Sequence, residues 1–229
     1  MSLWQYADIQ KKREEYQNFL NATLGWKVDK DFLLAYDSGH GPSGVLNGQN
    51  AQFGGVWKTT GLVHRRNNYF NFDVNITGYE AAVIDVGEAN VLVEIDLLST
   101  HSTRERSLGI VTNYVDDENW LLISVYGDSV FYERVLIGKV KDGVYTTLKS
   151  YTTDYTYYSP LRLSAKVIEG ELQAMINGVV VTTFDLSEED WNYYKQGTSH
   201  GFGTHLMARH YNNFLSNLAI YRTEWEATR

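Results

Sequence analysis

Alternation of apolar and polar residues in the middle of the chain is the feature that most limits the folds open to it. From Val91 to Leu97, every second residue is Val, Ile or Leu. Because successive side chains of a β-strand point to opposite faces, this period of two predicts a strand with one face in an apolar core. Two more strands are predicted at 108–114 and 120–126, joined by the polar turn Asp116–Asn119. The stretch 89–130 therefore predicts a β-meander of three consecutive strands.

Turn signals recur along the rest of the chain at the spacing of short strands. Glu169-Gly170 and Asn177-Gly178 each separate two apolar runs and predict hairpins, and Asn and Gly both tolerate the positive φ of a tight turn. Segment 187–194 begins Ser-Glu-Glu-Asp, a spacing like that of a capping box, and predicts a helical turn. Gly197–Gly203 is predicted to be a loop. This pattern predicts roughly a dozen strands in a sandwich.

Residues 2–22 carry the one convincing helical pattern. The charged run 11–15 occupies one side of the predicted helix, and apolar residues share the other side. Those apolar residues are Leu3, Tyr6, Ile9, Tyr16, Phe19 and Leu20. An isolated helix of this length is marginal in water, so we expect it to dock on the β domain or on a partner. We divide the chain into a helical arm at 1–24 and a β domain at 25–229.

Composition argues against several classes of protein. The net charge of −8 argues against a nucleic-acid-binding surface, which needs clustered positive charge. The chain has no cysteine, so it can form neither a disulfide framework nor a thiolate metal site. No apolar run approaches the roughly 20 residues of a membrane-spanning helix, so membrane insertion is not expected. The first residues also lack the basic-then-apolar order of a secretory signal.

Four segments, taken together, resemble the concanavalin A-like (laminin G-like) jelly-roll superfamily. They are NVLVEIDLL, GIVTNYVDDENWLLISV, KVIEGELQAMINGVVVTTFD and GFGTHLMARHYNNFLSNLAIYR. The strand–turn–strand unit, the hairpin with Asn-Gly and the closing aromatic-rich strand occur here in the family's order. The resemblance covers residues 30–222 and implies an all-β fold. The expected architecture is a two-sheet antiparallel jelly-roll sandwich with a short N-terminal α-helix.

The family includes lectins, glycosidases, laminin-type modules and bacteriophage tail or capsid appendages, and this chain looks most like the last group. The resemblance thus implies a non-enzymatic virion module, made in the host cytoplasm, that adheres to host cell-surface carbohydrate. It also implies contacts with other virion proteins and self-association through residues 1–24. Two alternatives stay open: a glycoside hydrolase or lyase of the same fold, and a structural decoration protein without a ligand.

The hydrolase alternative depends on Glu94-Ile95-Asp96, which is similar to the E-x-D-x-x-E strand of laminarinase-type retaining glucanases. In those enzymes the first carboxylate is the nucleophile and the third is the general acid and base. Retaining chemistry needs two carboxyls about 5–5.5 Å apart. Here Leu98 or Ser99 occupies the third position, and neither can protonate a leaving group. We therefore expect no enzyme, with Glu94 and Asp96 as the alternative catalytic residues.

Aromatic content is the unusual part of the composition, with 17 Tyr and 6 Trp. Such rings offer a flat apolar face and a polar edge, which suits sugar stacking, interfaces and cores alike. The candidate carbohydrate-binding residues are Tyr114, Trp120, Tyr126, Tyr157, Tyr158, Trp191 and Tyr194. For Trp120, on a strongly alternating strand, the favoured place is the core.

No cofactor and no metal site are predicted. His200, His205 and His210 lie five residues apart, a spacing that does not put neighbouring imidazoles on one strand face, so we expect turn or surface histidines. Calcium is the alternative, because jelly-roll lectins often hold it through loop oxygens, but six to eight donors are needed. The candidate calcium ligands are Asp85, Asp116 and Asp117.

Overall fold

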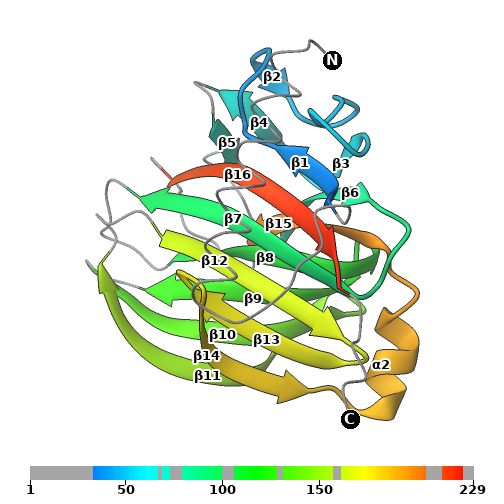
Figure 1. Ribbon diagram of the computed structural model, residues 1–229, viewed down its shortest axis with the longest axis vertical. Helices are drawn as coiled ribbons and strands as arrows, with labels where there is room; N and C mark the ends of the chain where they lie inside the picture. The colour runs from blue at the N-terminus through cyan, green and yellow to red at the C-terminus, as the bar shows by residue number, and fades with distance from the viewer. Residues whose placement is uncertain are drawn as a thin grey trace.

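The computed structural model describes residues 33–66, 69–72, 79–99, 106–127, 131–156, 161–204 and 213–223. Within these residues, the chain forms two antiparallel sheets stacked face to face, with one short helix beside one end of the strands (Figure 1). The expected all-β jelly-roll sandwich is confirmed. The expected N-terminal helix and the arm at 1–24 lie outside the described residues. The helix that is described is not long and apolar enough to span a membrane.

One sheet has nine strands. In spatial order they are β14 (Val179–Asp185), β13 (Glu171–Ile176), β12 (Leu161–Ile168), β7 (Val91–Ser99), β16 (Asn213–Arg222), β5 (Tyr69–Phe72), β4 (Val63–Arg66) and β2 (Gly44–Val45). The ninth strand, β1 (Leu33–Asp37), also pairs with β16.

The other sheet has seven strands. In spatial order they are β11 (Val144–Thr156), β10 (Phe131–Lys141), β9 (Asn119–Gly127), β8 (Arg106–Asp116), β15 (Ser199–Thr204), β6 (Glu80–Asp85) and β3 (Trp57–Thr59). The helix α2 (Glu188–Tyr194) lies between β14 and β15 in the sequence and packs against β8 and β9.

The prediction of a three-stranded meander is wrong. β8 and β9 form the expected hairpin, but β7 belongs to the other sheet, where it pairs with β12 and β16. Alternation predicts that a strand has a buried face, but it does not say which strands lie beside it. The chain therefore changes sheets between Ser99 and Arg106, and both halves of the stretch contribute to the same core.

Side chains from both sheets meet in a continuous apolar core. At one end of it, Phe202 of the seven-stranded sheet contacts Phe70 and Phe72 of β5 in the nine-stranded sheet, with ring centroids 5.0 and 5.7 Å away. Trp57 of β3 packs on the same Phe202 ring at 5.3 Å, edge to face. Such tilted and edge-to-face pairs are the favoured ring geometries. This aromatic group joins the two layers.

The short-range turn predictions are confirmed. Asn177 and Gly178, with φ of 50° and 80°, connect β13 to β14, and Glu169-Gly170 connects β12 to β13 in the same way. The Ser187 side chain accepts a hydrogen bond from the Asp190 amide at 3.1 Å and caps α2. These local signals succeed because the turn residues supply their own backbone geometry or hydrogen bond.

The predicted loop at Gly197–Gly203 is wrong, because most of it forms β15, an inner strand between β8 and β6. A methyl group on Gly201 would lie 2.0 Å from the Ala82 carbonyl oxygen, so glycine is needed there for close strand approach and not for a turn. His200 is likewise in the strand and fully buried, not at the surface. His205 and His210 lie outside the described residues.

Burial lowers the pKa of His200 to about 4. Its Nδ1 accepts a hydrogen bond from the Asn113 amide (3.1 Å), and its Nε2–H donates to the Glu88 carbonyl (2.7 Å), so the neutral ring is fully paired. The unfolded chain takes up this proton near pH 6.5, earlier than the folded one. Stability is therefore expected to fall as the pH falls from about 6.5 towards 4.

The histidine contribution is expected to reach about 2–3 kcal/mol between pH 7.5 and pH 4.5. Urea unfolding at these two pH values, in wild type and in His200→Gln, measures it as the difference between the two pH dependences. The variant keeps the carboxylates and loses only the histidine titration. Equal pH dependence of stability in both proteins would contradict the lowered pKa of His200.

Candidate functional site

Three of the candidate aromatic residues lie on one surface, the outer face of the seven-stranded sheet. On β9, Leu121, Ile123 and Val125 point into the core. The residues between them therefore point outward, and Trp120 and Leu122 join a separate apolar cluster there. Tyr126 is the next outward-pointing residue of β9, and Tyr114 of β8 belongs to the same separate apolar cluster. Alternation thus brings Trp120 and Tyr126 to one face, and the register shift of β8 between Thr112 and Asp116 turns Tyr114 to the same face.

One end of this face is closed by its own side chains. Trp120 is 0% exposed, and the Tyr79 ring meets it edge to face at 6.3 Å. Tyr79 Oη accepts a hydrogen bond from the Tyr145 amide at 3.1 Å. Tyr114 is buried too, and its hydroxyl donates to Asp117. A ring without an exposed face cannot stack on a sugar, so Trp120 and Tyr114 are packing residues and not the ligand platforms that we predicted.

The middle of the face is a row of small residues. Ser124 of β9 lies opposite Gly109 of β8, which lies opposite Gly203 of β15. We call these three residues the Ser124 row. The Ser124 hydroxyl is buried and makes no hydrogen bond within the described part of the chain. A buried hydroxyl without a hydrogen-bond partner costs about 1–3 kcal/mol of stability.

A second row lies beside it and is open to solvent. Tyr126 of β9 is in register with Arg134 of β10, which is in register with Thr152 of the edge strand β11. We call these three residues the Tyr126 row. Tyr126 is half-buried, and Arg134 and Thr152 are exposed. A ring, a guanidinium and a hydroxyl in one line can stack on an apolar ligand face and donate hydrogen bonds to ligand oxygens.

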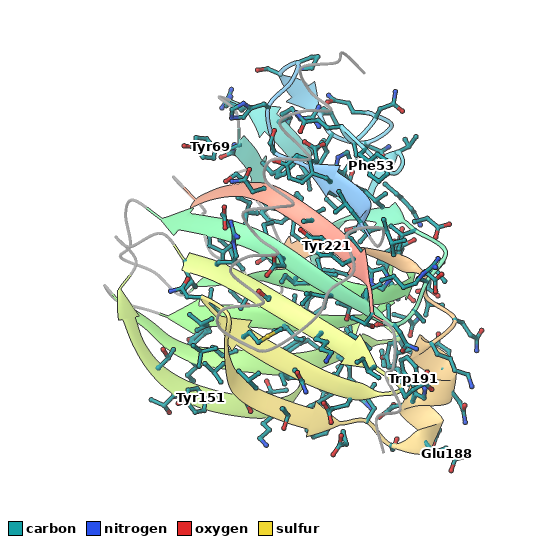
Figure 2. All side chains as sticks on the ribbon, in the orientation of Figure 1. Phe53, Tyr69, Tyr151, Glu188, Trp191 and Tyr221 are labelled. Atoms are coloured by element: carbon teal, nitrogen blue, oxygen red, sulfur yellow. The ribbon has the colours of Figure 1, made fainter. Side chains whose placement is uncertain are left out.

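The remaining candidate aromatic residues do not join this face. Tyr194 of α2 is 0% exposed and donates its hydroxyl proton to the Val140 carbonyl at 2.7 Å, so it too is a packing residue. Trp191 is half-buried and packs over Gly170. Figure 2 shows Trp191 on the opposite side of the view from Tyr151 of β11. Tyr157 and Tyr158 lie outside the described residues.

Glu94 and Asp96 share the outer face of the other, nine-stranded sheet. Arg162 donates to both Asp96 carboxylate oxygens, with Nε–Oδ1 and Nη2–Oδ2 distances of 2.7 and 3.0 Å. The Asn217 amide donates to Asp96 at 2.8 Å, and the Ser164 hydroxyl donates to Glu94 at 2.7 Å. The two acids are evident from the sequence, but their partners are not, because these come from distant strands.

The candidate calcium ligands serve as hydrogen-bond acceptors in turns. Asp85 accepts from the Gly87 amide and the Thr198 hydroxyl, and Asp116 accepts from the Glu118 amide and the Asn119 side chain. Asp117 lies 3.3 Å from the Lys58 ammonium. Among the described residues, no three Asp, Glu or His side chains gather as metal ligands. These residues therefore do not fit a site that must supply six to eight oxygens.

No protein-family model and no curated protein sequence matches the chain. Solved structures do resemble it. One comes from work on endo-acting O-glycanases that human gut microbiota express to initiate mucin breakdown; 84% of this chain and 100% of that one align, with TM-score 0.57 and 10% identity. Another is a laminarinase from Flavobacterium sp. UMI-01, with 83% and 100% aligned, TM-score 0.52 and 8% identity.

The third is the exoplasmic/lumenal domain of VIP36 in a Ca2+/Man3GlcNAc-bound form, with 75% of this chain and 85% of that chain aligned, TM-score 0.50 and 13% identity. At such low identity, these likenesses establish the fold alone. That fold is a two-sheet antiparallel jelly-roll sandwich, the architecture expected from the sequence.

Proposed function

We propose that this chain is a non-catalytic carbohydrate-binding module whose ligand lies across the outer face of the seven-stranded sheet. The observation that carries the proposal is the Tyr126 row, set in register beside the Ser124 row. The tyrosine ring stacks on the C–H face of a sugar. Arg134 and Thr152, which are exposed, bond the sugar oxygens.

The structural neighbours support a carbohydrate ligand but divide between binding and catalysis. The VIP36 domain is bound to Man3GlcNAc, whereas the laminarinase is an enzyme by name. We favour binding because Asp96 is paired with Arg162 and because Leu98 or Ser99 stands where the family motif has its acid. Incubation with laminarin, agar or alginate is expected to release no new reducing ends. Release that Glu94→Gln abolishes would establish the hydrolase alternative instead.

Replacing Tyr126 by Ala is expected to weaken glycan binding roughly tenfold or more, because a stacked ring contributes on the order of 1.5 kcal/mol or more. The wild type is first screened on a glycan array that includes Man3GlcNAc. Calorimetry with the tightest-binding glycan then compares the variant with the wild type.

Tyr151→Ala is the matched control for this experiment. Tyr151 is an exposed tyrosine of β11, but its register partner is Val135, whose side chain faces the core side of the sheet. The control is expected to leave the affinity unchanged. The proposal fails if the wild type binds no glycan at high concentration, or if both variants lose affinity equally.

We further propose that the module belongs to a bacteriophage virion, in a tail, baseplate or capsid appendage, and adheres to the carbohydrate of its host. The sequence resemblance is the support for this setting. Contacts with other virion proteins and between copies would hold the module in place. Sedimentation with cell-wall preparations from a panel of bacteria tests it. We expect retention on some of them and its loss in Tyr126→Ala; retention on none would favour a decoration protein without a ligand.

A further inference from the structure

An exposed arginine, Arg134, occupies the middle of the Tyr126 row. Other arginines of the fold are neutralised within the chain: Arg65, Arg162 and Arg222 each form an ion pair with a carboxylate. No carboxylate of the described residues lies within ion-pair distance of Arg134, although the chain has 28 Asp and Glu residues. The guanidinium of Arg134 is therefore able to bind an anionic group from another molecule.

The described side chains around Arg134 on this outer face are all uncharged. They belong to the strands β8 to β11 and lie in the Tyr126 row or in the row next to it. These side chains are Ser107, Ser124, Tyr126, Leu136, Ser150 and Thr152. The chain as a whole has a net charge of −8, so its acids are concentrated elsewhere. An anion bound here would meet one positive charge and no negative charge from these neighbours.

The register places the charge of Arg134 beside the ring of Tyr126. The two residues lie directly opposite each other on neighbouring strands, which puts their Cβ atoms about 4.5–5.5 Å apart. A sugar that stacks on the tyrosine ring therefore has the guanidinium at its edge. A guanidinium is a planar fork that can bond both oxygens of a carboxylate, and such charge-assisted bonds are about twice as strong as neutral ones.

We propose that the ligand of the Tyr126 row is a glycan whose sugar ring carries a carboxylate, as in a uronic acid or a sialic acid. This inference rests on the proposed carbohydrate-binding function. The sugar ring stacks on Tyr126, Arg134 donates two hydrogen bonds to the carboxylate, and the hydroxyl of Thr152 bonds a sugar hydroxyl. A neutral sugar would leave the charge of Arg134 without a countercharge. Arg134 is thus the residue that selects acidic glycans over neutral ones.

The row can be reached from one side of the sheet. β11 is the edge strand, and β10 and β9 follow it in order (Figure 1). Ser150 and Thr152 of β11 are both exposed. The packed rings of Tyr79 and Trp120 close the other end of the face. An acidic glycan therefore approaches Arg134 across the β11 edge.

Calorimetry with matched pairs of glycans tests this inference on the full-length protein. Each pair consists of a carboxylated oligosaccharide and its methyl ester, which keeps the sugar ring and removes the charge. The probes are an oligogalacturonate for uronic acids and sialyllactose for sialic acids. The wild type is expected to bind at least one of these acids about tenfold or more tighter than its ester. The pair that shows the preference identifies the kind of acid.

Arg134→Gln removes the charge but keeps a hydrogen-bond donor. It is expected to bind the preferred acid about tenfold or more weakly than the wild type and to bind acid and ester alike. Arg134→Lys keeps the charge without the planar fork, and its affinity for the acid is expected to lie between those of the wild type and Arg134→Gln.

Arg66→Gln is the matched control, because it changes the net charge by the same amount. Arg66 is exposed and also lies opposite a tyrosine, Tyr69, but on the nine-stranded sheet. The control is expected to keep the full preference for the acid. Loss of the preference in both variants would overturn the assignment to Arg134.

Other results would also contradict the inference. It is overturned if the wild type binds acid and ester equally, if it binds a neutral glycan but neither acid, or if Arg134→Gln keeps the preference. Tighter binding of a sulfated galactan than of either acid overturns the choice of a carboxylate. Each of these results leaves the carbohydrate-binding proposal standing, whereas no binding of any glycan, charged or neutral, overturns both.

Discussion

Replacing Arg65 by Met is expected to lower the free energy of unfolding by about 3–5 kcal/mol. Arg65 and Asp37 form an ion pair whose side chains are 4% and 0% exposed. The Trp57 indole and the Gly39 amide each donate a further hydrogen bond to Asp37, both at 2.9 Å. Without the guanidinium, the Asp37 carboxylate would keep these neutral donors but would be buried without a countercharge.

The loss of stability in Arg65→Met is expected to depend on pH. Burial raises the pKa of Asp37, and the Arg65 charge opposes that shift. Removing Arg65 therefore raises the pKa further, so the folded variant binds a proton more readily than the unfolded chain. The destabilisation is expected to be larger at neutral pH and to shrink as the pH is lowered, because protonation of Asp37 removes the unpaired charge.

Chemical denaturation followed by tryptophan fluorescence measures this effect. Arg66→Met is the matched control, because Arg66 is the next residue of β4 and is exposed. Surface substitutions of this kind usually change stability by no more than about 0.5 kcal/mol. A cost below about 1 kcal/mol for Arg65→Met, or equal costs for the two variants, would show that the pair is not a main support of this end of the sandwich.

Phe202→Ala is expected to cost about 3–5 kcal/mol, the usual range for removing a large ring from a core. The ring is fully buried and lies 5.0–5.7 Å from the ring centroids of Trp57, Phe70 and Phe72. Because these neighbours belong to different sheets, the cavity would open where the two layers meet.

Guanidinium unfolding of Phe202→Ala, with Tyr151→Ala as an exposed-aromatic control, tests this expectation. The control is expected to stay within about 0.5 kcal/mol of the wild type. A loss below about 1.5 kcal/mol in Phe202→Ala would mean that the surrounding rings collapse into the space, and the aromatic group would then be less rigid than the ring contacts indicate.

The sequence predicted those parts of the fold that depend on local rules. Alternation along 91–97 correctly predicted a strand with one face in the core, and Asn177-Gly178 correctly predicted a hairpin. Strand neighbours could not be predicted in this way. β7 follows the same alternation as β9 yet lies in the other sheet, because the choice of partner depends on contacts between distant residues.

The candidate site could likewise be predicted only where it depends on local sequence. Tyr126 was identified from its sequence, whereas Arg134 and Thr152 become part of the site only through the register of three strands. The sequence gives no sign that Arg65 is buried, because its burial depends on Asp37, 28 residues away. Gly201 was read as a loop residue because the same residue type serves both in turns and where strands approach closely.

Amide chemical-shift mapping of the isotope-labelled chain, titrated with the tightest-binding glycan from the array, tests whether the glycan lies across the outer face of the seven-stranded sheet. The largest shifts are expected on β9 and β10, at Ser124, Tyr126 and Arg134. Largest shifts around Glu94 and Asp96 on the nine-stranded sheet, or no shifts at saturating glycan, would contradict it.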